Sequence, residues 1–250
     1  MAEFKVNEPV MGRRAFVGGS LAAGSLAFLA ACGQKGDGAG SGDAAAADGG
    51  KTLNYYINNP VCIDPYNVQE DQGTQVEFQL FDALMEFDFE NNELKGLAAE
   101  SFDVNEDATE FTFHLVEGAK FHNGDPVTAQ DFVRGWTRLV SPNSAISTEY
   151  GPSEISEGYD ALVNGETDEF SGLSCPDDNT LVVKLASAYA DFAYIASHPA
   201  LSPVPACAEE DAKNFYLAPV GNGPFMMKPD TKWEDGQYID IVKFDDYYGE

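Results

Sequence analysis

Apolar residues recur at helical spacing in two stretches of the chain. The first stretch is Val76, Leu80, Phe81, Leu84 and Met85, and the second is Phe132, Val133, Trp136, Leu139 and Val140. This spacing places apolar side chains on one face of a helix, so we expect two amphipathic helices that face a core. Thr128-Ala129-Gln130-Asp131 has the T-x-x-D form of a helix start, and Ser141-Pro142 ends that helix. Ala188–Ser197 predicts a third, short helix.

Strands are indicated where apolar and polar residues alternate or where strand formers gather. Phe111, Phe113 and Leu115 alternate with Thr112 and His114, which predicts a half-buried strand. Further strands are expected at Thr52–Ile57, Thr180–Leu185 and Tyr238–Phe244. Turn residues stand at 58–60, 64–65, 123–126, 177–179 and 221–224. Because strands and helices mix irregularly, the expected class is α/β or α+β, without internal repeats.

The N-terminal segment has the pattern of an export signal. Arg13-Arg14 precede an uncharged stretch from Gly18 to Ala31, and Cys32 follows at once. A basic start, a short apolar middle and a small-residue end are typical of a secretory signal peptide, here residues 1–31. The stretch is short of the roughly 20 residues that span a bilayer and contains glycines, so it makes a poor permanent transmembrane helix. The paired arginines favour twin-arginine export, with the general secretory route as the alternative.

Leu29-Ala30-Ala31-Cys32 resembles the bacterial lipobox. The small residues fit a peptidase cleft, and the Cys32 thiol is the nucleophile that receives diacylglycerol. The alternative is a cysteine that happens to end an apolar run. Residues 32–51, rich in Gly, Ala, Ser and Asp, predict a flexible tether. Since each buried acyl methylene contributes about 0.8 kcal/mol, we expect a lipoprotein anchored at the outer face of the cytoplasmic membrane, or a periplasmic protein.

The strong negative charge excludes some partners. The formal net charge is −28, from 42 acidic and 14 basic side chains. Such a chain repels phosphate backbones and anionic lipid headgroups, so we expect no nucleic-acid partner and no membrane contact through basic charge. A cationic ligand would be attracted toward the protein, although most acidic side chains simply form a solvated surface. Cys62, Cys175 and Cys207 are an odd set, so their disulfide pairing stays open.

The residues offer little catalytic or metal-binding chemistry. His114, His122 and His198 are the three histidines, and no H-E-x-x-H, G-x-S-x-G or phosphate-loop motif accompanies them. His114 is expected to face away from Phe113 in a surface or paired role. His122 with Asp125 falls short of a metal site. We therefore predict no catalytic residue, no metal ligand and no cofactor.

Several motifs occur together in an order that carries a family resemblance. They are Asp64-Pro65, Leu80–Leu84, Leu97–Phe102, Phe111–Leu115, Gly118–Phe132, Leu201–Pro205, Gly221–Phe225 and Asp245–Gly249. Together they resemble the oligopeptide/dipeptide-binding family of ABC-importer solute-binding proteins, and cover nearly everything after the tether. The resemblance implies an α/β, type II periplasmic-binding-protein lobe with an inserted extra domain. The first lobe would comprise 52–76 and about 197–250, and the extra domain about 77–196. By the same resemblance, we expect the second, C-terminal lobe of the family to be missing from these 250 residues.

The resemblance also implies function and site residues. We expect a monomeric, non-enzymatic protein that captures oligopeptides by strand-like pairing and delivers them to permease subunits with their ATPases. The peptide-pairing segment maps onto Glu70, Asp71, Gln72, Gly73 and Thr74; its alternative is a polar loop before a helix that starts near Gln75. Gly221, Asn222 and Gly223 would line the cleft or form a structural turn, and Tyr150 would wall a side-chain pocket or be a surface aromatic. Another solute (a metal chelate, haem or a sugar), a peptide-display or sensor lipoprotein, and an exported hydrolase are the alternative functions.

Overall fold

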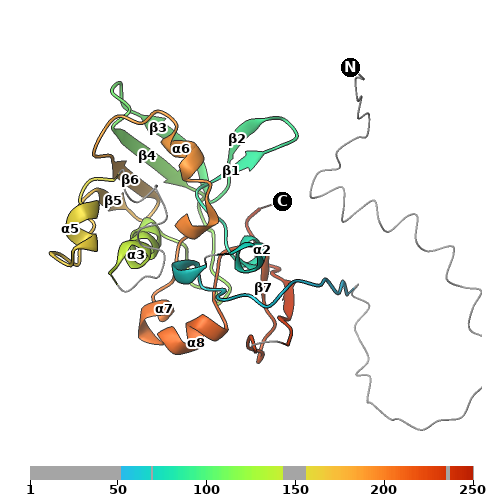
Figure 1. Ribbon diagram of the computed structural model, residues 1–250. Coiled ribbons are helices and arrows are strands. Elements are labelled where there is room, and N and C mark those ends of the chain that lie inside the picture. The colour runs from blue at the N-terminus through green and yellow to red at the C-terminus, as the bar shows by residue number, and fades with distance from the viewer. Residues whose placement is uncertain (1–51, 69, 143–155, 235–236, 250) are drawn as a thin grey trace, which may run out of the picture. The chain divides into compact units, whose positions relative to one another are not determined.

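The computed structural model describes residues 52–68, 70–142, 156–234 and 237–249 (Figure 1). The predicted signal peptide, the tether and Cys32 lie outside the described residues. Residues from Tyr56 onward belong to one contact unit, and the elements discussed below all lie in it. Within the described residues, no helix has both the length and the apolar character that a membrane crossing requires.

A four-stranded antiparallel sheet forms the framework of the first hydrophobic cluster. Its strand order is β3-β4-β6-β5, with β3 Ala99–Val104, β4 Glu110–Leu115, β6 Thr180–Lys184 and β5 Leu173–Asp177. Phe113 of β4 pairs with Phe102 on one side and with Leu181 on the other. The predicted alternation is confirmed, because Phe111, Phe113 and Leu115 are buried while Thr112 and His114 are only half-buried.

Helix α3 (Ala129–Val140) packs its apolar face into the same cluster. Its predicted start is confirmed: the Asp131 carboxylate accepts hydrogen bonds from the N–H and the hydroxyl of Thr128, both at 2.8 Å. The ring of Trp136 contacts Phe192 in α6 (Phe192–Ile195), and its indole N–H donates to the Leu201 carbonyl at 2.8 Å. The helix α5 (Tyr159–Val163) and the hairpin of β1 (Met85–Asp88) with β2 (Glu93–Gly96) complete this part.

A second hydrophobic cluster is built from two separate parts of the chain. Its elements are α2 (Asp71–Leu80), α7 (Cys207–Glu210), α8 (Ala212–Leu217), and β7 (Phe225–Met227) paired with β8 (Ile241–Lys243); the 3-10 helix η1 (Pro65–Asn67) precedes α2. Its buried side chains are Ile63, Val76, Leu80, Phe81, Val204, Ala208, Phe215, Met227 and Trp233. The 3-10 helix η2 (Pro199–Leu201) belongs to the first cluster and leads into the second. The lobe boundaries expected from the resemblance stay a prediction.

Several local predictions differ from the structure, among them the short helix expected at Ala188–Ser197, which spans only Phe192–Ile195. The helix expected over Val76–Met85 instead spans Asp71–Leu80, because the chain turns extended at Phe81 and Met85 begins β1. The expected strand at Tyr238–Phe244 is reduced to Ile241–Lys243, and no strand is assigned at Thr52–Ile57. The described cysteines Cys62, Cys175 and Cys207 are free thiols, which answers the open question of their pairing.

Candidate functional site

The turn that leads into α2 is fixed by a buried ion pair. Asp64 is 3% exposed and accepts a hydrogen bond from the Tyr66 N–H at 3.2 Å. The Arg138 guanidinium, from α3, donates to its two carboxylate oxygens at 3.0 and 3.4 Å. The guanidinium carbon also lies 5.1 Å from the centre of the Tyr66 ring and 5.5 Å from that of Phe215. These contacts tie η1 to α3 and α8. Sequence reasoning missed Arg138, because no local pattern links positions so far apart.

The predicted peptide-pairing segment forms the capped first turn of α2. Glu70 is the N-cap residue, and its carboxylate accepts from the Gly73 N–H at 3.1 Å and from the Val61 N–H at 2.8 Å. A Cβ on Gly73 would lie 2.4 Å from the Cys62 carbonyl oxygen, so only glycine permits this close approach. The alternative of a polar loop extending to Gln75 was wrong, because the helix begins at Asp71.

The remaining residues of this turn are available at the surface to different degrees. Asp71 is exposed, whereas Gln72 and Thr74 are half-buried and Gly73 is buried. Since residues 71–74 are helical, a peptide would meet the end of a helix here, and only Glu70 has the extended backbone of a strand. Peptide contact by Glu70–Thr74 stays a prediction.

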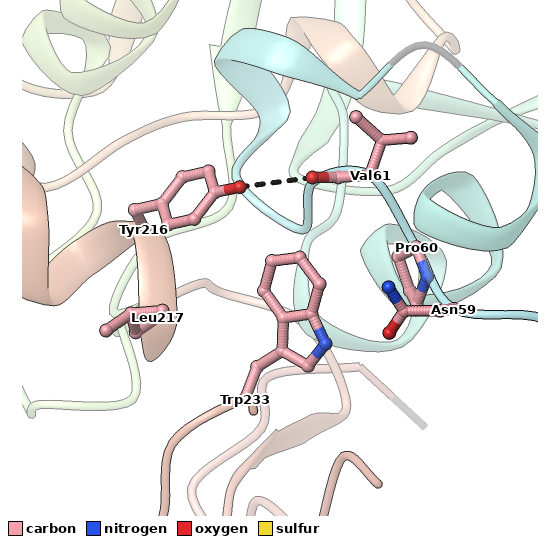
Figure 2. A pocket seen from close by; sticks show the side chains of 6 residues that line it. All are labelled: Asn59, Pro60, Val61, Tyr216, Leu217 and Trp233. Atoms are coloured by element: carbon pink, nitrogen blue, oxygen red, sulfur yellow. Dashed lines mark hydrogen bonds between the residues drawn. The ribbon is translucent and has the colours of Figure 1, made fainter. Parts of the chain in front are cut away.

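A pocket of about 350 Å³ opens beside Val61, the residue whose N–H binds the Glu70 carboxylate (Figure 2). Its walls are Asn59, Pro60, Val61, Tyr216, Leu217 and Trp233. The Tyr216 hydroxyl donates to the Val61 carbonyl at 3.1 Å, so that the backbone of Val61 is held on both sides. The rings of Tyr216 and Trp233 have centroids 5.7 Å apart. These wall residues come from segments far apart in the sequence, so no spacing could reveal the pocket.

The predicted cleft-lining turn Gly221-Asn222-Gly223 is buried inside the molecule. A Cβ on Gly221 would lie 1.8 Å from the Leu80 carbonyl oxygen. The Asn222 side chain pairs with the main chain of Asp82: its oxygen accepts from the Asp82 N–H and its amide donates to the Asp82 carbonyl, each at 3.0 Å. These three residues are buried and pack closely against the end of α2, and their lining of the cleft stays a prediction.

His122, about 100 positions earlier in the sequence, forms two hydrogen bonds with the same turn. Its Nδ1 accepts from the Gly221 N–H at 3.0 Å, and its Nε2 lies 3.1 Å from the Gly223 carbonyl oxygen, to which it donates. Burial lowers the pKa of His122 to about 4, which keeps the ring neutral and suited to this pair of bonds. His122 thus has a structural role. Asp125, which the sequence analysis considered beside it as a metal ligand, accepts a hydrogen bond from the Asn123 side chain.

A buried carboxylate completes this cluster. Asp82 accepts hydrogen bonds from the hydroxyls of Tyr247 and Tyr248 at 2.7 and 2.9 Å. Burial, followed by the charge of Asp82, raises the pKa of Tyr248 well above its usual value, so that this phenol stays a donor. The Asp82 cluster, defined as Asp82, Asn222, Tyr247 and Tyr248, joins three distant segments and is structural in character.

Other predicted chemistry is placed as follows. Tyr150 and Cys32 lie outside the described residues. His114 lies 2.9 Å from the Asp103 carboxylate at the surface, as the expected paired role requires. Among the described residues, no group of three or more His, Cys, Asp or Glu side chains is arranged to hold a metal ion.

The chain resembles peptide-binding proteins in both sequence and structure. It is 36% identical over 176 residues to the periplasmic oligopeptide-binding protein OppA of Escherichia coli K12, covering 66% of this chain and 31% of that protein. It is 32% identical over 217 residues to the dipeptide-binding protein DppE of Bacillus subtilis 168, covering 84% and 38%. Haemophilus influenzae OppA, solved in complex with the peptide RPPGFSPFR, has a TM-score of 0.69 at 29% identity, covering 76% of this chain and 37% of that one.

The match extends to the substrate-binding domain of an oligopeptide ABC transporter from Bacillus anthracis Ames, with a TM-score of 0.70 at 29% identity. The chain spans roughly a third of the length of these proteins. The predicted fold class is confirmed, since these structures are type II periplasmic binding proteins and this mixed α/β chain matches part of their length. Residues 93–250 match the sequence profile of bacterial extracellular solute-binding proteins, family 5, middle part. The chain therefore belongs to the family 5 bacterial extracellular solute-binding proteins, a family of transport proteins that includes the peptide-binding proteins of ABC importers.

Proposed function

We propose that this chain captures oligopeptides outside the cytoplasmic membrane and presents them to the permease of an ABC importer. The observation that carries the proposal is its structural similarity to a relative solved with a bound peptide. A transport protein of this kind recognises its cargo without reacting with it, in accord with the prediction that no residue here performs covalent chemistry.

The turn at the start of α2 is the proposed peptide contact. It presents the exposed Asp71 and the half-buried Gln72 and Thr74 next to the pocket lined by Tyr216 and Trp233. An anchored Glu70 gives this surface a fixed geometry, which reduces the ordering cost of binding. The net charge of −28 favours cationic peptides during encounter.

Calorimetric titration of the full mature chain with the nonapeptide RPPGFSPFR tests this function. We expect saturable binding that weakens at high salt, since the peptide carries an arginine at each end. Asp71→Asn is expected to weaken binding, whereas Asp168→Asn makes the same charge change at an exposed position after α5 and is expected to leave it unchanged. Absence of binding, or recovery of a single non-peptide solute by mass spectrometry of the purified protein, would refute the peptide assignment.

The lipid anchor is a separate part of the proposal. We propose that Cys32 is the lipidated residue, that the protein is a monomer, and that residues 33–51 tether it to the outer face of the membrane. Cys32→Ala is expected to move the protein from the membrane fraction to the soluble fraction of the cell envelope. Retention of the variant in membranes would contradict the anchor and leave the peptide-binding test unaffected.

A further inference from the structure

One ionisable side chain in the second hydrophobic cluster has no role in the contacts described so far. Glu77 lies on the inner face of α2 with Gly73, Val76 and Leu80, and it is only 1% exposed. Its Oε1 atom has no hydrogen-bond partner among the described residues. A buried carboxyl oxygen without a hydrogen-bond partner is rare in native structures, because an ionised carboxyl is costly to keep away from water.

The charged groups around Glu77 disfavour its ionisation. Burial, then the carboxylate of Asp64, then that of Glu70 raise the pKa of Glu77 well above its usual value. The guanidinium of Arg138 is bound to Asp64, so this cation is already paired with another acid. The nearby thiol of Cys62 carries no charge at neutral pH, since burial raises its pKa to about 12.

The other elements packed against α2 supply no positive charge to Glu77. Strand β7 (Phe225–Met227) and η2 (Pro199–Leu201) contain no ionisable residue. His198, which precedes η2, is half-buried, and loss of contact with water lowers its pKa to about 4, so its ring is neutral near pH 7. The surroundings therefore accept a neutral carboxyl and oppose a carboxylate.

We propose that Glu77 is a positioning residue whose uncharged carboxyl lets α2 pack against residues 61–64, and whose ionisation releases the first turn of α2. Two contacts hold that turn. The backbone of Gly73 lies against the Cys62 carbonyl, and the Glu70 carboxylate binds the Val61 N–H at 2.8 Å. Glu77 follows Gly73 by one helical turn on the same face, so a charge there acts on both contacts.

Ionisation weakens these contacts in two ways. A carboxylate at Glu77 repels those of Asp64 and Glu70, and it demands water inside the second hydrophobic cluster. Opening of residues 61–68 and 70–74 satisfies both demands. If the proposed function holds, peptide capture by the turn Glu70–Thr74 is consequently lost at alkaline pH; only this consequence depends on that function.

Infrared spectroscopy and hydrogen exchange test the proposal without any ligand. At pH 7 the wild-type protein is expected to show the C=O band of a protonated carboxylic acid, and Glu77→Gln is expected to lack it. From pH 6 to pH 9, protection of amides 61–74, corrected for the intrinsic exchange rate, is expected to fall at least tenfold in the wild type and less than twofold in Glu77→Gln. Glu166→Gln, at an exposed position, is the control and is expected to behave as the wild type.

Two results would overturn the proposal: absence of the protonated band in the wild type, or an equal loss of protection in Glu77→Gln. Glu77→Met, which removes the charge and keeps an apolar stem, serves as the second variant and is expected to show the same pH-independent protection. The infrared result on the wild type decides the charge state even if both variants fold poorly. A chain that ignores RPPGFSPFR yet shows these pH effects refutes the peptide function alone.

Discussion

The ion pair between Asp64 and Arg138 offers a quantitative test of how the candidate site is held. The side chains are 4% and 13% exposed, so water cannot replace a lost partner. Arg138→Met keeps the unbranched apolar stem and removes the guanidinium. It leaves the Asp64 carboxylate buried, with the Tyr66 N–H as its remaining hydrogen-bond donor among the contacts described above.

The expected loss follows from this isolation of a charge. Removing one partner of a buried ion pair costs about 3–5 kcal/mol, whereas an exposed pair is worth about 0–1 kcal/mol. Since a domain is stable by about 5–15 kcal/mol, Arg138→Met should remove a large part of the unfolding free energy. Adding Asp64→Asn removes the stranded charge, so the double variant is expected to lose about 1–3 kcal/mol less than the sum of the single losses.

Urea unfolding followed by circular dichroism measures these differences, provided that the slope of each transition is unchanged. Lys120→Met is the matched control, because it breaks the exposed Lys120–Asp246 pair, whose atoms are 2.9 Å apart, close to the 3.0 Å of the buried pair. A loss below about 1 kcal/mol in Arg138→Met, or equal losses in both variants, would show that burial does not determine the strength of these pairs.

Three further predictions concern packing and pH. Gly221→Ala is expected to cost about 3 kcal/mol or more in urea unfolding, because its Cβ would meet the Leu80 carbonyl at 1.8 Å; an unchanged midpoint would contradict this packing. The pKa of His122 is about 4 in the folded protein and 6.5 in the unfolded chain. Its contribution of about 3 kcal/mol to the unfolding free energy is therefore present above pH 6.5 and lost as the pH falls to 4. His122→Asn should flatten this part of the pH–stability profile, and an unchanged profile would be evidence against the two hydrogen bonds of His122. Trp136→Phe removes the bond to the Leu201 carbonyl and is expected to cost about 2–4 kcal/mol by thermal unfolding; a neutral result would mean that this bond contributes little.

Local sequence patterns correctly predicted the strands and helices whose conformation is determined by residues close together in the sequence. The alternation of Phe111, Phe113 and Leu115 reports a strand buried on one face, and the hydroxyl and acid of Thr128 and Asp131 close a hydrogen-bonded helix start. Motifs in a fixed order also predicted the family. The strand and helix signals depend on neighbouring residues, and the motifs on their order along the chain, so none of them required knowledge of the fold.

The prediction failed where distant residues decide the conformation. Phe81, Leu84 and Met85 are buried, as their spacing predicted, but they lie beyond the end of α2. At Asp82 the side chain of Asn222 bonds to the main chain and stabilises an extended course, a contact between residues 140 positions apart. The helical spacing correctly predicted which side chains are buried, but tertiary hydrogen bonds determine the extended backbone at Asp82.

Buried polar residues occur where the chain passes between the two hydrophobic clusters. Asp82 lies between Phe81 of the second cluster and Leu84 of the first, and Ser202 lies between Leu201 of the first and Val204 of the second. Apolar burial is non-directional, so it does not by itself fix how one cluster is oriented on the other. Hydrogen bonds have defined geometry, and those of the Asp82 cluster and of His122 supply that orientation. The Gly221–Gly223 turn, expected from sequence to line the cleft or to form a structural turn, packs against the end of α2 at Leu80, and its bonds to His122 help to fix this orientation.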